Sequence, residues 1–242
     1  MNESRHVDEQ VNRLDRPLDL VLHLMDRQVI GDDGLMVCKV DDVELGQRED
    51  LSISVTGLVA GAAALVPRYG GDHERGLLRF WRRMGVEQAT RAVPWRIGLG
   101  DIERLGSAVH LRVPRNGVLV SQDTSSAAAG TTRRRLNDLL HMTVRGADGG
   151  VLGNVLDVRA EPSSAEPGRR IVVTGFAVGR GHPGGLLGYD RRAGQGPWLV
   201  NKVVRWLHRG SGFVDAEDVT ELDWDAEVLT VGVSTMKDLK PV

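Results

Sequence analysis

An internal repeat with offsets of 115–120 residues constrains this 242-residue chain more than any other feature. The segment VIGDDGLMVCKVDDV at 29–43 matches VRGADGGVLGNVLDV at 144–158, with the Asp-Gly and Asp-Val pairs aligned. Three further matches follow in the same order with little drift, which argues for duplication rather than chance. These matches pair 55–61 with 173–179, Tyr69 with Tyr189, and 107–113 with 225–231.

Each repeat is expected to be rich in β-strands. Asp33-Gly34 and Asp148-Gly149 are dipeptides typical of tight hairpin turns, whose central residues need positive φ. Short β-branched or alternating runs, bounded by glycines, surround these turns and predict five or six strands in each repeat. So many short strands in about 95 residues favour a small β-barrel or sandwich. The runs lie at 35–43, 51–56 and 108–113, and at 151–158, 171–174 and 227–233.

One amphipathic helix is expected at the same place in both repeats, after the matched tyrosine and before the last strands. The apolar residues of these two segments recur at helical spacing, and Pro197 suits a first helical turn. The positions are Leu77, Leu78, Trp81 and Met84 in the first repeat, and Leu199, Val200, Val203, Val204 and Leu207 in the second.

The repeat boundaries divide the chain into five parts. Residues 114–135 include a stretch of small and polar residues that is typical of a flexible or partly ordered linker. The predicted parts are an N-terminal tail (1–16), a first repeat (17–113), this linker, a second repeat (136–233) and a C-terminal tail (234–242).

The search for catalytic chemistry yields no candidate. The seven histidines show no metal-ligand spacing, and the glycines of 98–106 fit no nucleotide-binding motif and are expected to form a turn. Cys38 is the single cysteine, lies in an expected strand and is interpreted as an inert thiol. We therefore expect no catalytic residues, no cofactor and no metal. No apolar run reaches membrane-spanning length and no signal peptide precedes the repeats, which favours a cytoplasmic protein.

Positive charge is concentrated in the two helical segments. Residues 66–96 carry a net charge of +4 and residues 179–210 a net charge of +5, although the whole chain has a formal charge of −2. Such segments are either solvated faces of helices that cover the barrels or docking surfaces for a polyanion. The candidate partner-binding residues form two basic stripes: Arg79, Arg82 and Arg83, and Lys202, Arg205 and Arg209.

The repeated pattern, in which Asp-Gly is followed by a glycine and then by Val-x-Asp-Val, resembles the PRC-barrel family. This family is named after the photosynthetic reaction centre H subunit and also supplies the C-terminal domain of the ribosome maturation factor RimM. The better match is at 139–158; in the first repeat Leu35 and Cys38 stand where Gly150 and Gly153 lie. The resemblance implies two tandem small β-barrels that dock onto proteins or RNA–protein assemblies, without a catalytic site.

Three functional hypotheses remain open. The first is a non-enzymatic adaptor that docks onto an acidic protein assembly through its barrel faces and basic helices. The second is a ribosome-associated or RNA-binding factor. The shortage of aromatic residues disfavours recognition of single-stranded RNA by base stacking, whereas binding to the RNA backbone would need only the arginines. The third is a peripheral protein on the anionic inner membrane leaflet. In each case the repeats are expected to pack as a pseudo-dimer, since duplicated domains can reproduce an isologous interface within one chain.

Overall fold

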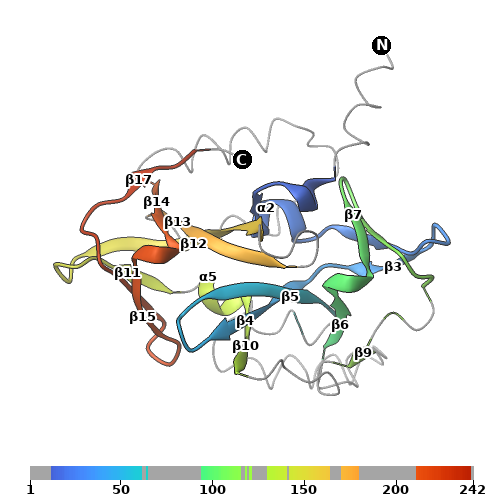
Figure 1. The fold of residues 1–242 in the computed structure, drawn as a ribbon, viewed down its shortest axis with the longest axis horizontal. Coiled ribbons are helices and arrows are strands. Elements are labelled where there is room, and N and C mark those ends of the chain that lie inside the picture. Colours follow the sequence, from blue (N-terminus) through green and yellow to red (C-terminus); the bar gives the residue numbers. More distant parts are fainter. Residues whose placement is uncertain are drawn as a thin grey trace, which may run out of the picture. The chain divides into compact units, whose positions relative to one another are not determined.

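The fold is mainly β and divides into two compact units. The computed structural model describes residues 12–61, 64, 94–115, 118, 120–121, 130–140, 142–163, 170–179 and 211–240. Unit 1 comprises Met1–Asn137 and Ala160–Val173, and unit 2 comprises Asp138–Arg159 and Thr174–Val242. Figure 1 shows the described strands and the few short helices between them.

Unit 1 contains a four-stranded sheet in the order β3-β2-β8-β7. Strand β2 pairs antiparallel with β3 and parallel with β8, while β4 pairs antiparallel with β5, which in turn pairs antiparallel with β6. The strands are β2 (Gln28–Ile30), β3 (Met36–Lys39), β4 (Asp42–Arg48), β5 (Ile53–Ala60), β6 (Trp95–Gly98), β7 (Ile102–Leu105) and β8 (Val109–Leu111), with the 3-10 helix η5 (Leu99–Asp101) before β7.

The second half of the chain repeats this order of elements. Strand β11 pairs antiparallel with β12 and parallel with β16, β12 pairs with β13, and β13 pairs antiparallel with β14. The elements are β11 (Thr143–Arg145), β12 (Val151–Pro162), β13 (Ile171–Gly179), β14 (Ser211–Asp215), the 3-10 helix η8 (Ala216–Asp218), β15 (Val219–Asp223) and β16 (Val228–Val231). The single strand β12 stands where the first repeat has β3 and β4.

Hairpins form at both Asp-Gly dipeptides, as predicted, and the two hairpins have equivalent hydrogen bonds. The Gly34 N–H donates to Gly31 O at 3.0 Å, and the Gly149 N–H donates to Gly146 O at 2.9 Å. Only the glycine of each Asp-Gly pair has positive φ, +75° at Gly34 and +76° at Gly149. The turn therefore differs from the expected two-residue turn: the aspartate instead accepts the N–H two residues later, at 3.1 Å from Asp33 and 3.0 Å from Asp148.

Equivalent positions of the two repeats are buried alike. Val29 and Val144 are fully buried, and strands β5 and β13 have the same burial pattern over their first eight residues, which alternates over the first four and is buried throughout the next four. That alternation places one face of each strand in the core, as a period of two requires. The cores consist mainly of aliphatic residues, with Phe176 the largest fully buried side chain among the residues described.

Residues assigned by sequence to the linker and to the C-terminal tail form strands. Thr131–Arg135 is strand β10, which pairs antiparallel with β4 and runs directly into the helix α5 (Leu136–Leu140). Strand β9 (Val120–Ser121) pairs with β6, and β17 (Lys237–Asp238) pairs with β14. Composition alone suggested solvated connections here, because a strand held by a distant partner needs no apolar residues of its own.

A short strand and helix also begin the first repeat. Strand β1 (Leu18–Asp19) runs directly into the helix α2 (Leu20–Leu24), after the 3-10 helix η1 (Arg13–Asp15). Both repeats therefore start with a strand followed at once by a five-residue helix. The 98–106 segment, expected to be a turn, forms the 3-10 helix η5 followed by strand β7.

Candidate functional site

The six predicted partner-binding residues, Arg79, Arg82, Arg83, Lys202, Arg205 and Arg209, lie outside the described residues, as do both predicted amphipathic helices. The strands on either side of these segments are described. Ala60 at the end of β5 pairs with Trp95 at the start of β6, and Gly179 at the end of β13 pairs with Ser211 at the start of β14. Each basic segment therefore joins two neighbouring antiparallel strands, at the same place in both repeats.

The charges of the two segments between these strands are strongly unbalanced. Residues 61–94 contain six arginines against three acidic residues, and residues 180–210 contain five arginines and one lysine against a single aspartate. The net charges of the two segments are therefore +3 and +5.

Among the described residues, several polar side chains meet in an ion cluster around the buried Glu44 on β4. Arg96 Nε on β6 lies 2.7 Å from Glu44 Oε1, and Arg133 Nε on β10 lies 3.2 Å from Glu44 Oε2. The Thr56 hydroxyl on β5 also donates to Oε1 at 2.7 Å. The Glu44 side chain is 3% exposed, so its charge depends on these donors rather than on water.

Gly57 gives Arg96 its path to Glu44. A Cβ at Gly57 would lie 3.2 Å from Arg96 Nε and 2.7 Å from Ile97 O. The guanidinium passes over this glycine, where its NH2 group donates to Thr56 O at 2.6 Å. Glycine is required here because the Ile97 carbonyl and the Arg96 side chain of the neighbouring strand occupy the space of a Cβ.

The second repeat places different side chains at the equivalent positions. Arg159 follows Asp157-Val158 as Glu44 follows Asp42-Val43, and Phe213 pairs with the residue two beyond Gly175, as Arg96 does with the residue two beyond Gly57. The Arg159 guanidinium lies 4.9 Å from the centroid of the Phe213 ring and donates to Lys240 O at 2.7 Å. A cation–π contact therefore occupies the place of the ion cluster.

Gly175 has the same relation to Phe213 that Gly57 has to Arg96. A Cβ there would come within 2.2 Å of the ring and 2.6 Å of Val214 O. In both repeats, a glycine leaves room for a side chain from the start of the strand that follows the basic segment.

The repeated Asp-Val motif acquires a structural role. Asp42 is fully buried, and its Oδ1 accepts the N–H of Val43 at 2.8 Å and the N–H of Asn137 at 3.2 Å. It therefore holds the beginning of helix α5. Asp157 accepts the N–H of Val158 in the same way, at 2.7 Å. Sequence reasoning explained the neighbouring acidic residues by turn chemistry and missed these two; the signal was an acidic residue inside an apolar strand in both repeats.

Two further titratable groups have shifted pKa values. Burial is the main cause that lowers the pKa of His23, whose Nδ1 accepts the Asp19 N–H at 3.0 Å. Burial, assisted by the charge of Asp41, raises the pKa of the Cys38 thiol to about 12. Cys38 lies in strand β3, as predicted, and such a pKa keeps it a thiol at neutral pH, which makes it a poor nucleophile.

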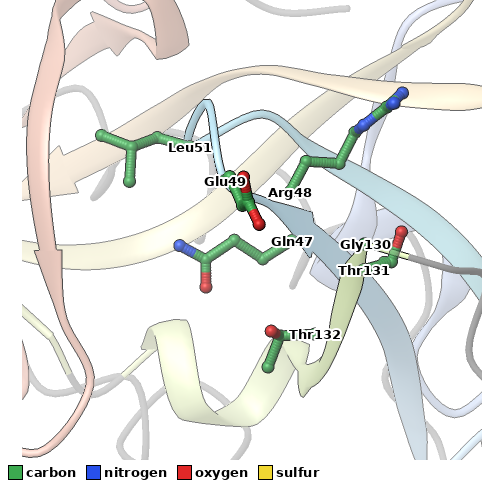
Figure 2. A pocket seen from close by; sticks show the side chains of 7 residues that line it. All are labelled: Gln47, Arg48, Glu49, Leu51, Gly130, Thr131 and Thr132. Atoms are coloured by element: carbon green, nitrogen blue, oxygen red, sulfur yellow. The ribbon is translucent and has the colours of Figure 1, made fainter.

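One open hollow is lined mainly by polar groups of the β4–β5 turn and the start of β10, and in Figure 2 Arg48 and Leu51 extend to opposite sides of it. The lining residues are Gln47, Arg48, Glu49, Leu51, Gly130, Thr131 and Thr132.

Within the same part of the chain, no three His, Cys, Asp or Glu side chains are grouped so that they could hold a metal ion. No helix there is both long and apolar enough to cross a membrane.

A scan against protein-family models finds no match to this chain, and a search of curated proteins finds none either.

Proposed function

We propose that the protein is a non-enzymatic docking protein of two tandem PRC-barrel-like repeats, which binds an acidic protein assembly through its two basic segments. The observation that carries this proposal is the equivalent position of the segments. Each joins a pair of antiparallel strands, and each holds a large excess of positive charge. Long insertions between paired strands are a common location for binding residues, because the sheet holds their ends in place.

The chemistry of the described residues is consistent with this proposal. Glu44 is buried and is bonded to residues of β5, β6 and β10, so the ion cluster is assigned a role in stabilising the fold rather than in meeting a substrate. The proposal assigns recognition to the arginines and lysine of the segments, and a supporting role to the sheet.

The test is a charge reversal in the full chain. Arg82, Arg83, Lys202 and Arg205 are each changed to Glu, and the tagged protein is cross-linked and purified from its native host. Recovery of the partner is expected to be lost while the melting temperature stays nearly unchanged, since exposed substitutions cost within about 0.5 kcal/mol each. Recovery by the unchanged protein is expected to fall steeply between low and physiological salt.

A matched control reverses four exposed basic residues outside the segments: Lys39, Arg115, Arg145 and Lys240. This variant has the same change in net charge and is expected to retain the partner. Equal loss in both variants would indicate a non-specific charge effect. Recovery that disappears after nuclease treatment would point to RNA, and recovery only with membrane vesicles would point to lipid; either result would overturn the proposal of a protein partner.

A further inference from the structure

The pairing of β5 with β13 has a special register. Ser54 lies opposite Val172, and Val55 lies opposite Ile171. The sequence repeat aligns Val55 with Val173, an offset of 118, so that Val172 is the counterpart of Ser54 itself. A residue that faces its own counterpart across an antiparallel pair marks a two-fold axis, as in an isologous dimer.

The strands that begin the two repeats are exchanged. Strand β10, which leads into α5 of the second repeat, pairs with β4 of the first. Strand β1, which leads into α2 of the first repeat, pairs with β12, the counterpart of β4 in the second. The exchange is reciprocal, as the two-fold axis requires.

Buried polar contacts accompany the exchange on the side of the first repeat. Arg133 on β10 bonds to Glu44, and the Asn137 N–H at the start of α5 donates to Asp42. Glu44 and Asp42 are 2% and 0% exposed. A buried carboxylate that loses its donors is costly, so β4 of the first repeat depends on a segment from beyond the sequence boundary between the repeats.

We infer that the two repeats complete each other: β10 and the start of β13, from the second repeat, extend the β4–β5 pair of the first, and the β5–β13 pairing has a local two-fold axis between Ser54 and Val172. Each repeat gives its first strand to the other and is incomplete alone. This inference is independent of the docking function, because it concerns only how the two repeats complete each other.

The test begins with the folded full-length chain. A protease recognition sequence is inserted within 122–129, and the purified protein is cleaved there. The two fragments are expected to co-elute as one species, with a melting temperature that rises with protein concentration, whereas the melting temperature of the uncleaved protein does not. Fragments that elute separately in native buffer, each with its β-sheet signal, would overturn the inference.

A pair of cysteines then locates the axis in the same cleavable chain, with Cys38 changed to Ser. Directly opposite residues in antiparallel strands have Cα atoms about 4.5–5.5 Å apart, within the range that a disulfide spans. Ser54→Cys with Val172→Cys is expected to link the two fragments on a non-reducing gel. The matched control, Ser54→Cys with Thr174→Cys, moves one cysteine by two residues and is expected not to link them. A link in the control, or in neither pair, would overturn the position of the axis.

Discussion

The two repeats bring opposite chemistry to the same backbone position. In the first, Glu44 is buried and bonded to Arg96 and Arg133. In the second, Arg159 stacks on Phe213 and bonds to a backbone carbonyl near the surface. The glycines over which Arg96 and Phe213 pass are present in both.

This difference shows which feature of the site both repeats need. The close approach of the strand after the basic segment needs a glycine, whatever side chain passes over it. The side chain that passes over the glycine is charged in one repeat and aromatic in the other. Its partner in the first repeat is a buried carboxylate, which must keep its donors, whereas the partly exposed arginine of the second repeat can turn to water. The first repeat should therefore be the more sensitive of the two to substitutions at this position.

The largest expected effect follows removal of the carboxylate. Glu44→Ala is expected to lower the free energy of unfolding by about 3 kcal/mol, at the lower end for a broken buried pair, because Arg96 and Arg133 can reach water. Urea denaturation followed by circular dichroism measures it. The exposed Glu103→Ala is the control and should stay within about 0.5 kcal/mol. Equal small effects would contradict the assignment of Glu44 as the centre of the cluster.

The glycines should rank in the reverse order. Gly175→Ala is expected to cost about 2 kcal/mol and Gly57→Ala about 1 kcal/mol, since the rigid Phe213 ring yields less than the Arg96 side chain. Thermal melts of both variants measure the difference. Gly100→Ala serves as control, because a Cβ there meets nothing within 4 Å. A larger loss at Gly57 would show that the backbone carbonyls, not the crossing side chains, decide the cost.

Loss of the cation–π contact should matter less. Arg159→Ala is expected to destabilise the protein by about 1 kcal/mol, the range of a contact near the surface. Arg159→Lys keeps the charge and should recover part of the loss. Comparison of their denaturation midpoints with that of Glu44→Ala measures the asymmetry of the repeats. A cost as large as that of Glu44→Ala would refute it.

Acid sensitivity should also belong to the first repeat. The pKa of His23 is lowered, so its folded-state pKa lies below its unfolded value. Its contribution to stability is present above the unfolded pKa and is lost as the pH falls through the folded pKa. The helix of the second repeat has Leu139 at the same position. His23→Asn offers an acceptor that does not titrate, and should flatten the decrease in unfolding free energy between pH 7 and 5. An unchanged slope would assign the acid response to other groups.

The parts of the fold that the sequence predicts are those set by local patterns. Both Asp-Gly hairpins and the strands around them follow from alternation and turn chemistry, which act within a few residues. Strand β10 could not be foreseen, because Thr131–Arg135 forms a strand only through pairing with β4, about 85 residues away in the sequence.

The ion cluster was missed for the same reason. Glu44 is a single acidic residue at the end of a strand-like run, and nothing nearby indicates that Arg96 and Arg133 will meet it. Arg133 falls in the segment that composition assigned to a linker, whereas its side chain is a quarter exposed and contacts Glu44. A buried ion pair between residues far apart in the sequence cannot be predicted unless the strand pairing is known.

The most direct test of the account is a pair of double-mutant cycles, one in each repeat. The first combines Glu44→Ala with Arg96→Ala, and the second combines Arg159→Ala with Phe213→Ala. The account predicts a coupling energy of about 2 kcal/mol for the buried ion pair and less than about 1 kcal/mol for the cation–π pair. Equal coupling energies in the two repeats, or none between Glu44 and Arg96, would contradict the central claim. That claim is that the same backbone position is stabilised by a buried ion pair in one repeat and by a cation–π contact in the other.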